Sequence, residues 1–215
     1  DVAERLGRED IRIANQFALY GLRNTACEFS VNQLVESFKE LGFKIYWEKA
    51  DRIMDLLRQA FLLMKVEEHA FALKPQTTAT PKVYGIDPGI VFAVSRANQQ
   101  DVGKRFETAV YLELRRRMAG KRTESITSYT APGPRGQKVD FLLGDALAAE
   151  PYALIQVTAS MASPRTRERE VDSLVAAMEA TGIKEGTIVT LREEERIETE
   201  AGPIEVVPAC KWFLR

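Results

Sequence analysis

The chain has 215 residues, of which 45% are hydrophobic, so it is long enough to bury a core in one or two domains. Its 30 Lys and Arg nearly balance 31 Asp and Glu, which excludes a strong overall field for nucleic acid and leaves only local patches. No apolar run approaches the roughly 20 residues needed to span a bilayer, and no secretory leader pattern opens the chain.

Two further features of the sequence bear on the cellular compartment and on the length of the natural chain. Cys27 and Cys210 lie far apart and lack the spacing of a zinc site, which favours reduced thiols in a cytosolic protein. The chain begins at Asp1 rather than at a methionine. We therefore expect a cytoplasmic protein that makes no membrane contact, and a chain that is a piece of a longer one.

The first 74 residues predict three helices and a hairpin. A helix is expected over residues 10–25, and Ser30 is expected to cap a second one that ends at Gly42. A third helix is predicted from Trp47 to about Ala60, followed by the strand-like runs "FLLMKV" and "HAFAL" with a turn between them. This order predicts a winged helix over residues 1–74.

Residues 75–100 are predicted to be a linker with one short strand. The stretch "KPQTTATPK" is rich in proline and threonine, and "VYGIDPGIV" reads as a short strand that ends in a turn. The second domain is therefore expected at residues 101–215.

In the second domain, helices are predicted from residue 101 to Gly120 and over residues 165–181. Strands are predicted in "ESITSY", "KVDFLL", "YALIQVT", "GTIVTL" and "IEVVPA", the last two around an acidic turn. Strands linked by short turns come before a strand–helix–strand crossover, which predicts an α/β fold with a mixed sheet.

Several polar residues interrupt apolar patterns in this domain. Glu107 shares a helix face with Val110, Tyr111 and Leu114, so we expect it to face the sheet; the alternative is an acid that favours the helix dipole in the first turn. Asp140 lies in the middle of an apolar strand, where an acid is disfavoured unless it has a function.

Two polar residues on the following strand add to this pattern. Gln156 and Thr158 are two residues apart, so they should project from one face and could stand beside Asp140 if the strands pair. The alternative is a satisfied polar pair in an edge strand.

The sequence lacks the residues that other catalytic mechanisms and a nucleotide site require. The only histidine, His69, is expected on the surface, so Ser-His-Asp and Cys-His catalysis have no base. The loop "APGPRGQK" lacks the ending of a phosphate-binding loop, so no nucleotide site is predicted within the chain.

A local excess of cations runs from residue 104 to residue 138 and would suit a phosphate backbone of DNA or RNA. Helix ends also collect cations that favour the dipole, which is the alternative for Arg115 and Arg116. Charges of both signs along the third helix make a protein partner at least as plausible there. The candidate nucleic-acid contacts are Lys104, Arg105, Arg115, Arg116 and Arg135.

An acid on a helix, an acid on one strand and a polar pair on the next resembles the PD-(D/E)XK nuclease superfamily, a restriction-endonuclease-like αβββαβ fold. The whole chain is similar to the C-terminal region of a family of AAA-type ATP-binding proteins, in which a winged helix precedes such a domain. The matching stretches are "DVAER", "FSVNQLVE", "PKVYGIDPG", "KRFETAV", "KVDFLL", "ALIQVTAS", "RERE" and "VPACKWFL".

This resemblance implies that Glu107, Asp140 and position 156 hold Mg²⁺, with a lysine at position 158 acting on the attacking water. Here Gln156 replaces the acid and Thr158 replaces the lysine, which leaves catalysis open. Lys138, two residues before Asp140, is the candidate for a relocated lysine; the alternative is a solvated lysine at a strand start. ATP would bind only in an ATPase module upstream of Asp1.

We therefore expect a module that engages nucleic acid or a protein partner and is built on a degenerate nuclease fold. The alternative is an active Mg²⁺-dependent phosphodiesterase. An assembly or regulatory role has no residue-level pattern behind it.

Overall fold

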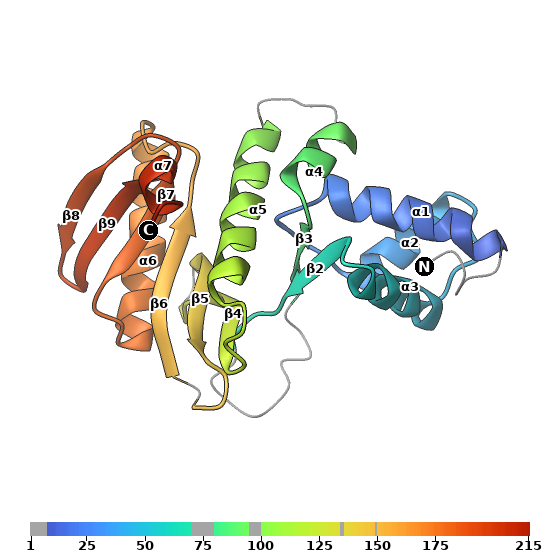
Figure 1. Cartoon of the computed structure of the whole chain (residues 1–215), viewed down its shortest axis with the longest axis horizontal. Coiled ribbons are helices and arrows are strands. Elements are labelled where there is room, and N and C mark those ends of the chain that lie inside the picture. Colours follow the sequence, from blue (N-terminus) through green and yellow to red (C-terminus); the bar gives the residue numbers. More distant parts are fainter. Residues whose placement is uncertain (1–7, 70–79, 95–99, 134–135, 149) are drawn as a thin grey trace. The chain divides into compact units, whose positions relative to one another are not determined.

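The computed structural model describes residues 8–69, 80–94, 100–133, 136–148 and 150–215 (Figure 1). The chain forms two compact units. The first contains the described residues up to Val66 and from Thr80 to Ala109, and the second contains Glu67 to His69 and the chain from Val110 onward. Both form α/β structures, as predicted, and each is described by itself below.

The first unit packs helices against a small sheet. Its sheet is antiparallel with the strand order β1-β3-β2, so β3, the last of the three strands in the sequence, lies in the centre. Its elements are α1 (Arg8–Arg23), β1 (Cys27–Glu28), α2 (Val31–Glu40), α3 (Trp47–Gln59), β2 (Leu63–Val66), β3 (Lys82–Gly85), α4 (Pro88–Val94) and the first part of α5 (Gln100–Arg117).

Local sequence explains the helices of this unit. Ser30 caps α2, as predicted, because its side chain accepts a hydrogen bond from the Gln33 amide at 3.4 Å. The predicted third helix is confirmed as α3. Phe17 of α1 is fully buried and meets Phe38 of α2 edge to face, with ring centroids 4.7 Å apart.

The division of the chain differs from the predicted boundaries at residues 74 and 100. The predicted linker contains β3, which pairs with both β1 and β2, and α4, so this segment completes the first unit. The predicted hairpin strand "HAFAL" lies largely outside the described residues. Glu68 forms a bridge with Ser128 of the second unit's sheet, which places this segment with that unit.

The second unit contains a six-stranded mixed sheet, and this confirms the predicted sheet type. Strands β4, β5 and β6 are antiparallel, β7 and β9 run parallel to β6, and β8 is antiparallel to β9 at the edge. The elements are the end of α5, β4 (Glu124–Thr130), β5 (Lys138–Asp145), β6 (Glu150–Val157), α6 (Pro164–Thr181), β7 (Gly186–Thr190), β8 (Glu195–Thr199), β9 (Gly202–Pro208) and α7 (Ala209–Trp212).

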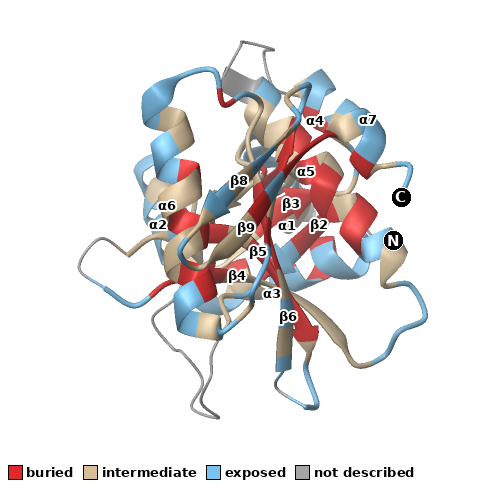
Figure 2. Cartoon of the chain, turned by 90° about the vertical axis from the view of Figure 1, so that its left-hand side faces the viewer, coloured by how far each residue is buried: buried red, intermediate tan, exposed pale blue. Residues whose placement is uncertain are grey.

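Helices α5 and α6 cover opposite faces of this sheet. Phe141 stacks on Tyr111 of α5, whereas the adjacent Leu142 packs in one core with Leu174 and Met178 of α6. Successive side chains of a strand point to opposite faces, so these contacts place the two helices. Figure 2 colours the buried positions of the sheet red.

Two expectations about this unit are wrong. The acidic segment between β7 and β9 is a strand, β8, and not only a turn. His69 is half-buried against the Tyr129 ring rather than on the surface, and burial lowers the pKa of its imidazole. Within the described residues, no helix has the length and apolar character needed to cross a membrane.

Candidate functional site

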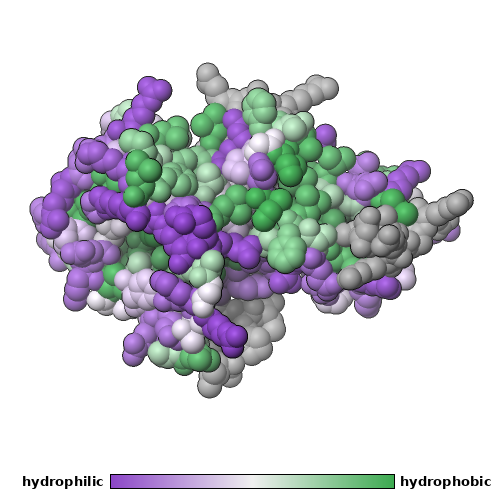
Figure 3. Space-filling model, in the orientation of Figure 1, coloured by the Kyte–Doolittle hydropathy of each residue, from purple (hydrophilic) through white to green (hydrophobic). Residues whose placement is uncertain are grey.

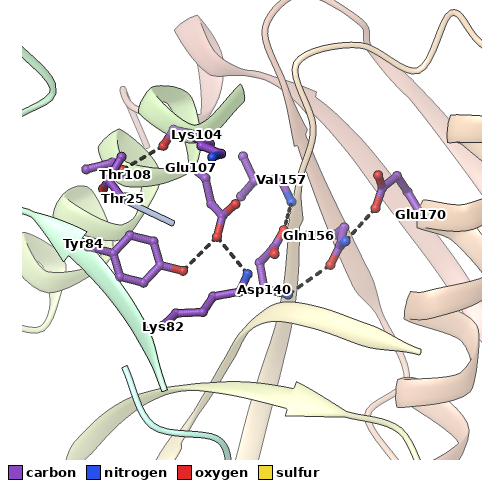
Figure 4. Close-up of polar contacts among 10 residues, drawn as sticks. All are labelled: Thr25, Lys82, Tyr84, Lys104, Glu107, Thr108, Asp140, Gln156, Val157 and Glu170. Atoms are coloured by element: carbon purple, nitrogen blue, oxygen red, sulfur yellow. Dashed lines mark hydrogen bonds and ion pairs between the residues drawn. The ribbon is translucent and has the colours of Figure 1, made fainter. Parts of the chain in front are cut away.

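The structure brings Asp140 and Gln156 together where β5 and β6 diverge (Figure 4). The ladder between these strands ends at the pair Phe141 and Ile155, one residue short of Asp140 and Gln156. The Asp140 carboxylate accepts a hydrogen bond from the Val157 amide at 3.0 Å, and Gln156 Oε1 accepts one from the Asp140 amide, also at 3.0 Å. Each side chain therefore binds the backbone of the opposite strand and continues the pairing beyond the ladder.

Gln156 also reaches helix α6. Its Nε2 donates to Glu170 Oε2 at 2.6 Å, and only 7% of Gln156 and 2% of Glu170 are exposed. Arg169, which is largely exposed, donates to the other oxygen of Glu170. The buried carboxylate is thus satisfied by an amide on one side and a guanidinium on the other, as a buried charge requires.

These contacts fix the orientation of the Gln156 amide. Its nitrogen faces a carboxylate and its oxygen faces a backbone N–H, so both ends are used within the unit. We call Asp140, Gln156, Glu170 and Arg169 the amide relay. Sequence reasoning did not find Glu170, although it lies four, seven and eight residues before Leu174, Ala177 and Met178, which form the buried face of α6.

Thr158 does not stand beside this group as a second polar side chain of the strand. It follows the end of β6, its amide donates to the Val189 carbonyl at 3.1 Å, and its hydroxyl donates to the Ser160 carbonyl at 3.3 Å. A hydroxyl cannot supply the cation that the resemblance implies at this position.

Lys138 begins β5 opposite Thr130 and is exposed. The prediction that Lys138 and Asp140 share a strand face relied on regular alternation, but the register between β4 and β5 shifts between Thr127 and Tyr129. Such irregularities redirect side chains, so spacing alone does not place the two residues on one face.

Glu107 belongs to the first unit, and there it faces β3. Its Oε1 accepts hydrogen bonds from Lys82 Nζ at 2.9 Å and from the Tyr84 hydroxyl at 2.8 Å (Figure 4). The side chains of Lys82 and Glu107 are only 15% and 14% exposed. Glu107 is thus largely buried, but it faces the small sheet of the first unit rather than the mixed sheet of the second domain that the sequence predicted. Lys82 and Tyr84 lie two residues apart on β3.

The predicted nucleic-acid contacts do not form one surface within a unit. Lys104 and Arg105 belong to the first unit, where the Arg105 guanidinium lies over the Phe92 ring at 5.1 Å. Arg115 is exposed in the second unit, whereas Arg116 forms two hydrogen bonds with the nearly buried Glu113. The fifth candidate, Arg135, lies outside the described residues.

The implied metal ligands Glu107, Asp140 and Gln156 would have to meet the ligand preferences of Mg²⁺. Mg²⁺ prefers carboxylate, carbonyl and water oxygens in an octahedral arrangement. In the second unit, Gln156 Oε1 and one Asp140 oxygen already accept backbone hydrogen bonds. Among the residues that the structure describes, no group of three or more His, Cys, Asp or Glu is arranged to hold a metal ion. The oxygens as arranged fit a hydrogen-bonded relay better than a magnesium ligand set.

Comparison of the chain with protein-family models, with curated proteins and with solved structures finds no match.

Proposed function

We propose that this chain is a binding module built on a degenerate nuclease fold, and that it belongs to an AAA-type ATPase. The observation that carries the proposal is the amide relay. The position that would carry a metal-binding acid is a glutamine, and both ends of its amide hold the unit together.

The order of elements supports the two fold assignments. In the first unit, three helices precede β2 and β3, and the sheet order β1-β3-β2 is that of a winged helix. In the second unit, α5 precedes the antiparallel strands β4, β5 and β6, and α6 then crosses to the parallel strand β7. This is the αβββαβ order of restriction-endonuclease-like domains.

Ion pairing supports a protein partner over nucleic acid for the first unit. On α3, which would be the groove-reading helix of a winged helix, Arg58 pairs with Asp55 and Lys49 pairs with Asp10. Neutralised cations interspersed with acids release few counterions from a phosphate backbone. DNA or RNA remains the second ligand class, with the exposed Arg115 as its best candidate contact.

An active Mg²⁺-dependent phosphodiesterase is the alternative function. It is favoured by one observation: Lys82 lies 2.9 Å from Glu107, so a lysine accompanies the acid that the resemblance assigns to the metal. Lys82 then replaces Lys138 as the candidate for the relocated lysine.

Calorimetric titration with Mg²⁺ and Mn²⁺ distinguishes the two functions without a guess about substrate. The binding module predicts equal and negligible heats for the wild type, for Asp140→Ala and for the control Asp172→Ala, which removes a half-buried acid from α6. Binding in the millimolar range or tighter that Asp140→Ala alone abolishes would overturn the proposal and favour the phosphodiesterase.

A second titration tests the ligand class. Anisotropy with labelled single-stranded and double-stranded DNA and RNA should show weak, strongly salt-dependent binding that Arg115→Ala changes less than threefold. A loss of tenfold or more on that substitution would assign the module to nucleic acid.

A further inference from the structure

Strand β8 forms one edge of the six-stranded sheet and pairs only with β9 among the described strands (Figure 1). Its sequence is Glu-Arg-Ile-Glu-Thr, residues 195–199. The side chains of Arg196 and Glu198 are 64% and 71% exposed and pair with each other at 2.7 Å, whereas Ile197 packs against the core beneath α6. The molecular surface at this edge is mainly hydrophilic in Figure 3.

The hairpin determines which backbone groups of β8 point away from β9. A two-residue loop joins Thr199 to its partner Gly202, and such a loop closes on a hydrogen-bonded pair. Hydrogen-bonded and non-hydrogen-bonded pairs alternate along an antiparallel ladder, so Ile197 bonds to β9 and Arg196 and Glu198 do not.

Pro203 gives independent support for this assignment. It lies opposite Glu198 and has no N–H to donate, which suits a non-hydrogen-bonded pair. The N–H and C=O groups of Arg196 and Glu198 therefore point toward the open side of the sheet.

We propose that β8 is a self-association edge, which pairs antiparallel with β8 of a second copy of this chain about a two-fold axis at Ile197. In this register Arg196 lies opposite Glu198 of the second copy, and Glu198 lies opposite its Arg196. The outward N–H and C=O groups of these residues then meet each other, and opposite charges face across the junction. This pairing concerns the sheet edge alone and does not depend on the proposed function.

The charge pattern selects this register over others. A parallel pairing in register would place Arg196 opposite a second Arg196, and like charges directly opposite each other destabilise a pair. Charged side chains on an edge strand also discourage pairing with unrelated apolar strands. The sequence of β8 thus disfavours most partners and complements itself. Because only one apolar side chain lies at the centre, the association should be modest and sensitive to salt.

Charge reversal tests the register directly. Sedimentation velocity over a concentration series should show reversible dimerisation of the wild-type chain. Arg196→Glu and Glu198→Arg should each weaken dimerisation at least tenfold, since each places like charges opposite each other twice. The double variant restores opposite charges and should bring dimerisation back to within threefold of the wild type. Thermal unfolding of all four proteins at low concentration verifies that each is folded.

Two results would overturn the proposal. One is a wild-type chain that sediments as a monomer at every concentration. The other is dimerisation that the single reversals leave unchanged, which would assign the contact to another surface.

A cysteine cross-link provides a second test that does not depend on affinity. In the two-fold register, Ile197 faces Ile197 of the second copy in a non-hydrogen-bonded pair, whose Cα separation of about 4.5 Å suits a disulfide. Ile197→Cys in a background with Cys27→Ser and Cys210→Ser should form a disulfide-linked dimer under mild oxidation. Thr199→Cys is the control, because its copies would lie about 13 Å apart. Equal cross-linking of both variants, or of neither, would contradict the register.

Discussion

Gln156 of β6 donates a hydrogen bond of 2.6 Å to Glu170 of α6, and both side chains are buried. The Oε1 atom of Gln156 accepts a hydrogen bond from the Asp140 backbone N–H, so this one side chain connects α6, β5 and β6. A buried carboxylate is stable there only because each of its oxygens has a donor. Gln156 therefore has a structural role in this chain.

A double-mutant cycle measures this role. Gln156→Leu leaves the buried Glu170 short of a donor, and Glu170→Leu leaves the Gln156 amide unsatisfied, so we expect each to cost about 2–4 kcal/mol of unfolding free energy. The double variant should cost at least about 1 kcal/mol less than the sum, since neither partner is then orphaned. Urea denaturation provides the measurement. Glu168→Leu, at an exposed neighbouring position, is the control and should change stability by less than about 0.5 kcal/mol. Additive costs would show that the two residues act separately.

The pattern of the sequence predicted the local elements better than their assembly. Helix α3 and the Ser30 cap follow from short-range signals, and both were found. In the structure the buried face of α6 comprises Glu170, Ser173, Leu174, Ala177 and Met178, so a carboxylate lies among its core positions. A carboxylate counts as polar in a hydrophobic periodicity, so the spacing of Glu170 from Leu174 and Met178 did not single it out; the structure adds the partner on β6 that satisfies it inside.

The missed strand β8 and the difference in the domain boundary have separate physical causes. Strand β8 has a single apolar residue, Ile197, so its alternation is too short to distinguish from a turn. The sequence predicts a short strand where β3 lies but not its place in the first unit's sheet, because its pairing with β1 and β2 joins residues far apart in sequence. The adjacency of Asp140 and Gln156 was foreseeable because strand pairing of neighbours in sequence is common.

The ion pair between Lys82 and Glu107 gives a second prediction. Lys82→Met keeps most of the length of the side chain but removes the charged donor to the largely buried Glu107 carboxylate; of the two donors, the Tyr84 hydroxyl stays. We therefore expect a loss of about 2–3 kcal/mol in the free energy of unfolding. The matched control is Lys39→Met, which removes an exposed pair with Glu36 and should cost less than about 0.5 kcal/mol. Thermal and urea unfolding of the two variants provide the comparison. Equal effects would mean that Glu107 does not need the lysine charge.

The pH dependence of stability should report Glu113. Hydrogen bonds from Arg116 and Arg117, with Arg116 contributing most, lower the pKa of this nearly buried carboxyl from 4.5 to about 2, against the opposing effect of burial. Because the pKa is lower in the folded chain, the carboxylate stabilises the fold above about pH 4.5, and this contribution is lost as pH falls toward 2.

Glu113→Gln removes this contribution. We expect the variant to be less stable than the wild type by about 1–2 kcal/mol at pH 7, and the difference to shrink steadily between pH 4.5 and the acid limit of folding. Urea denaturation at a series of pH values measures the difference, and Glu36→Gln on the surface of α2 is the control with a flat difference. A difference for Glu113→Gln that is constant with pH would show that its charge is not what stabilises the fold.

The turn between β8 and β9 depends on a glycine for two separate reasons. Gly202 has a φ of +131°, a conformation that other residues rarely adopt, and a Cβ added there would lie 2.1 Å from the Lys184 carbonyl oxygen. The neighbouring atom belongs to the backbone, so it cannot move away as the end of a side chain could. Gly202→Ala should therefore displace the hairpin or the loop that contains Lys184.

Gly120→Ala separates the two causes. Gly120 also has a positive φ, +85°, but no atom lies within 4 Å of its added Cβ, so only the backbone cost of about 1–2 kcal/mol applies. We expect Gly202→Ala to cost at least about 2 kcal/mol more than this control, because the steric clash adds to the backbone cost. Equal losses would mean that the hairpin yields freely and that the backbone conformation alone requires glycine. The close approach of the Lys184 carbonyl to Gly202 would then contribute little to the stability of the β8–β9 hairpin.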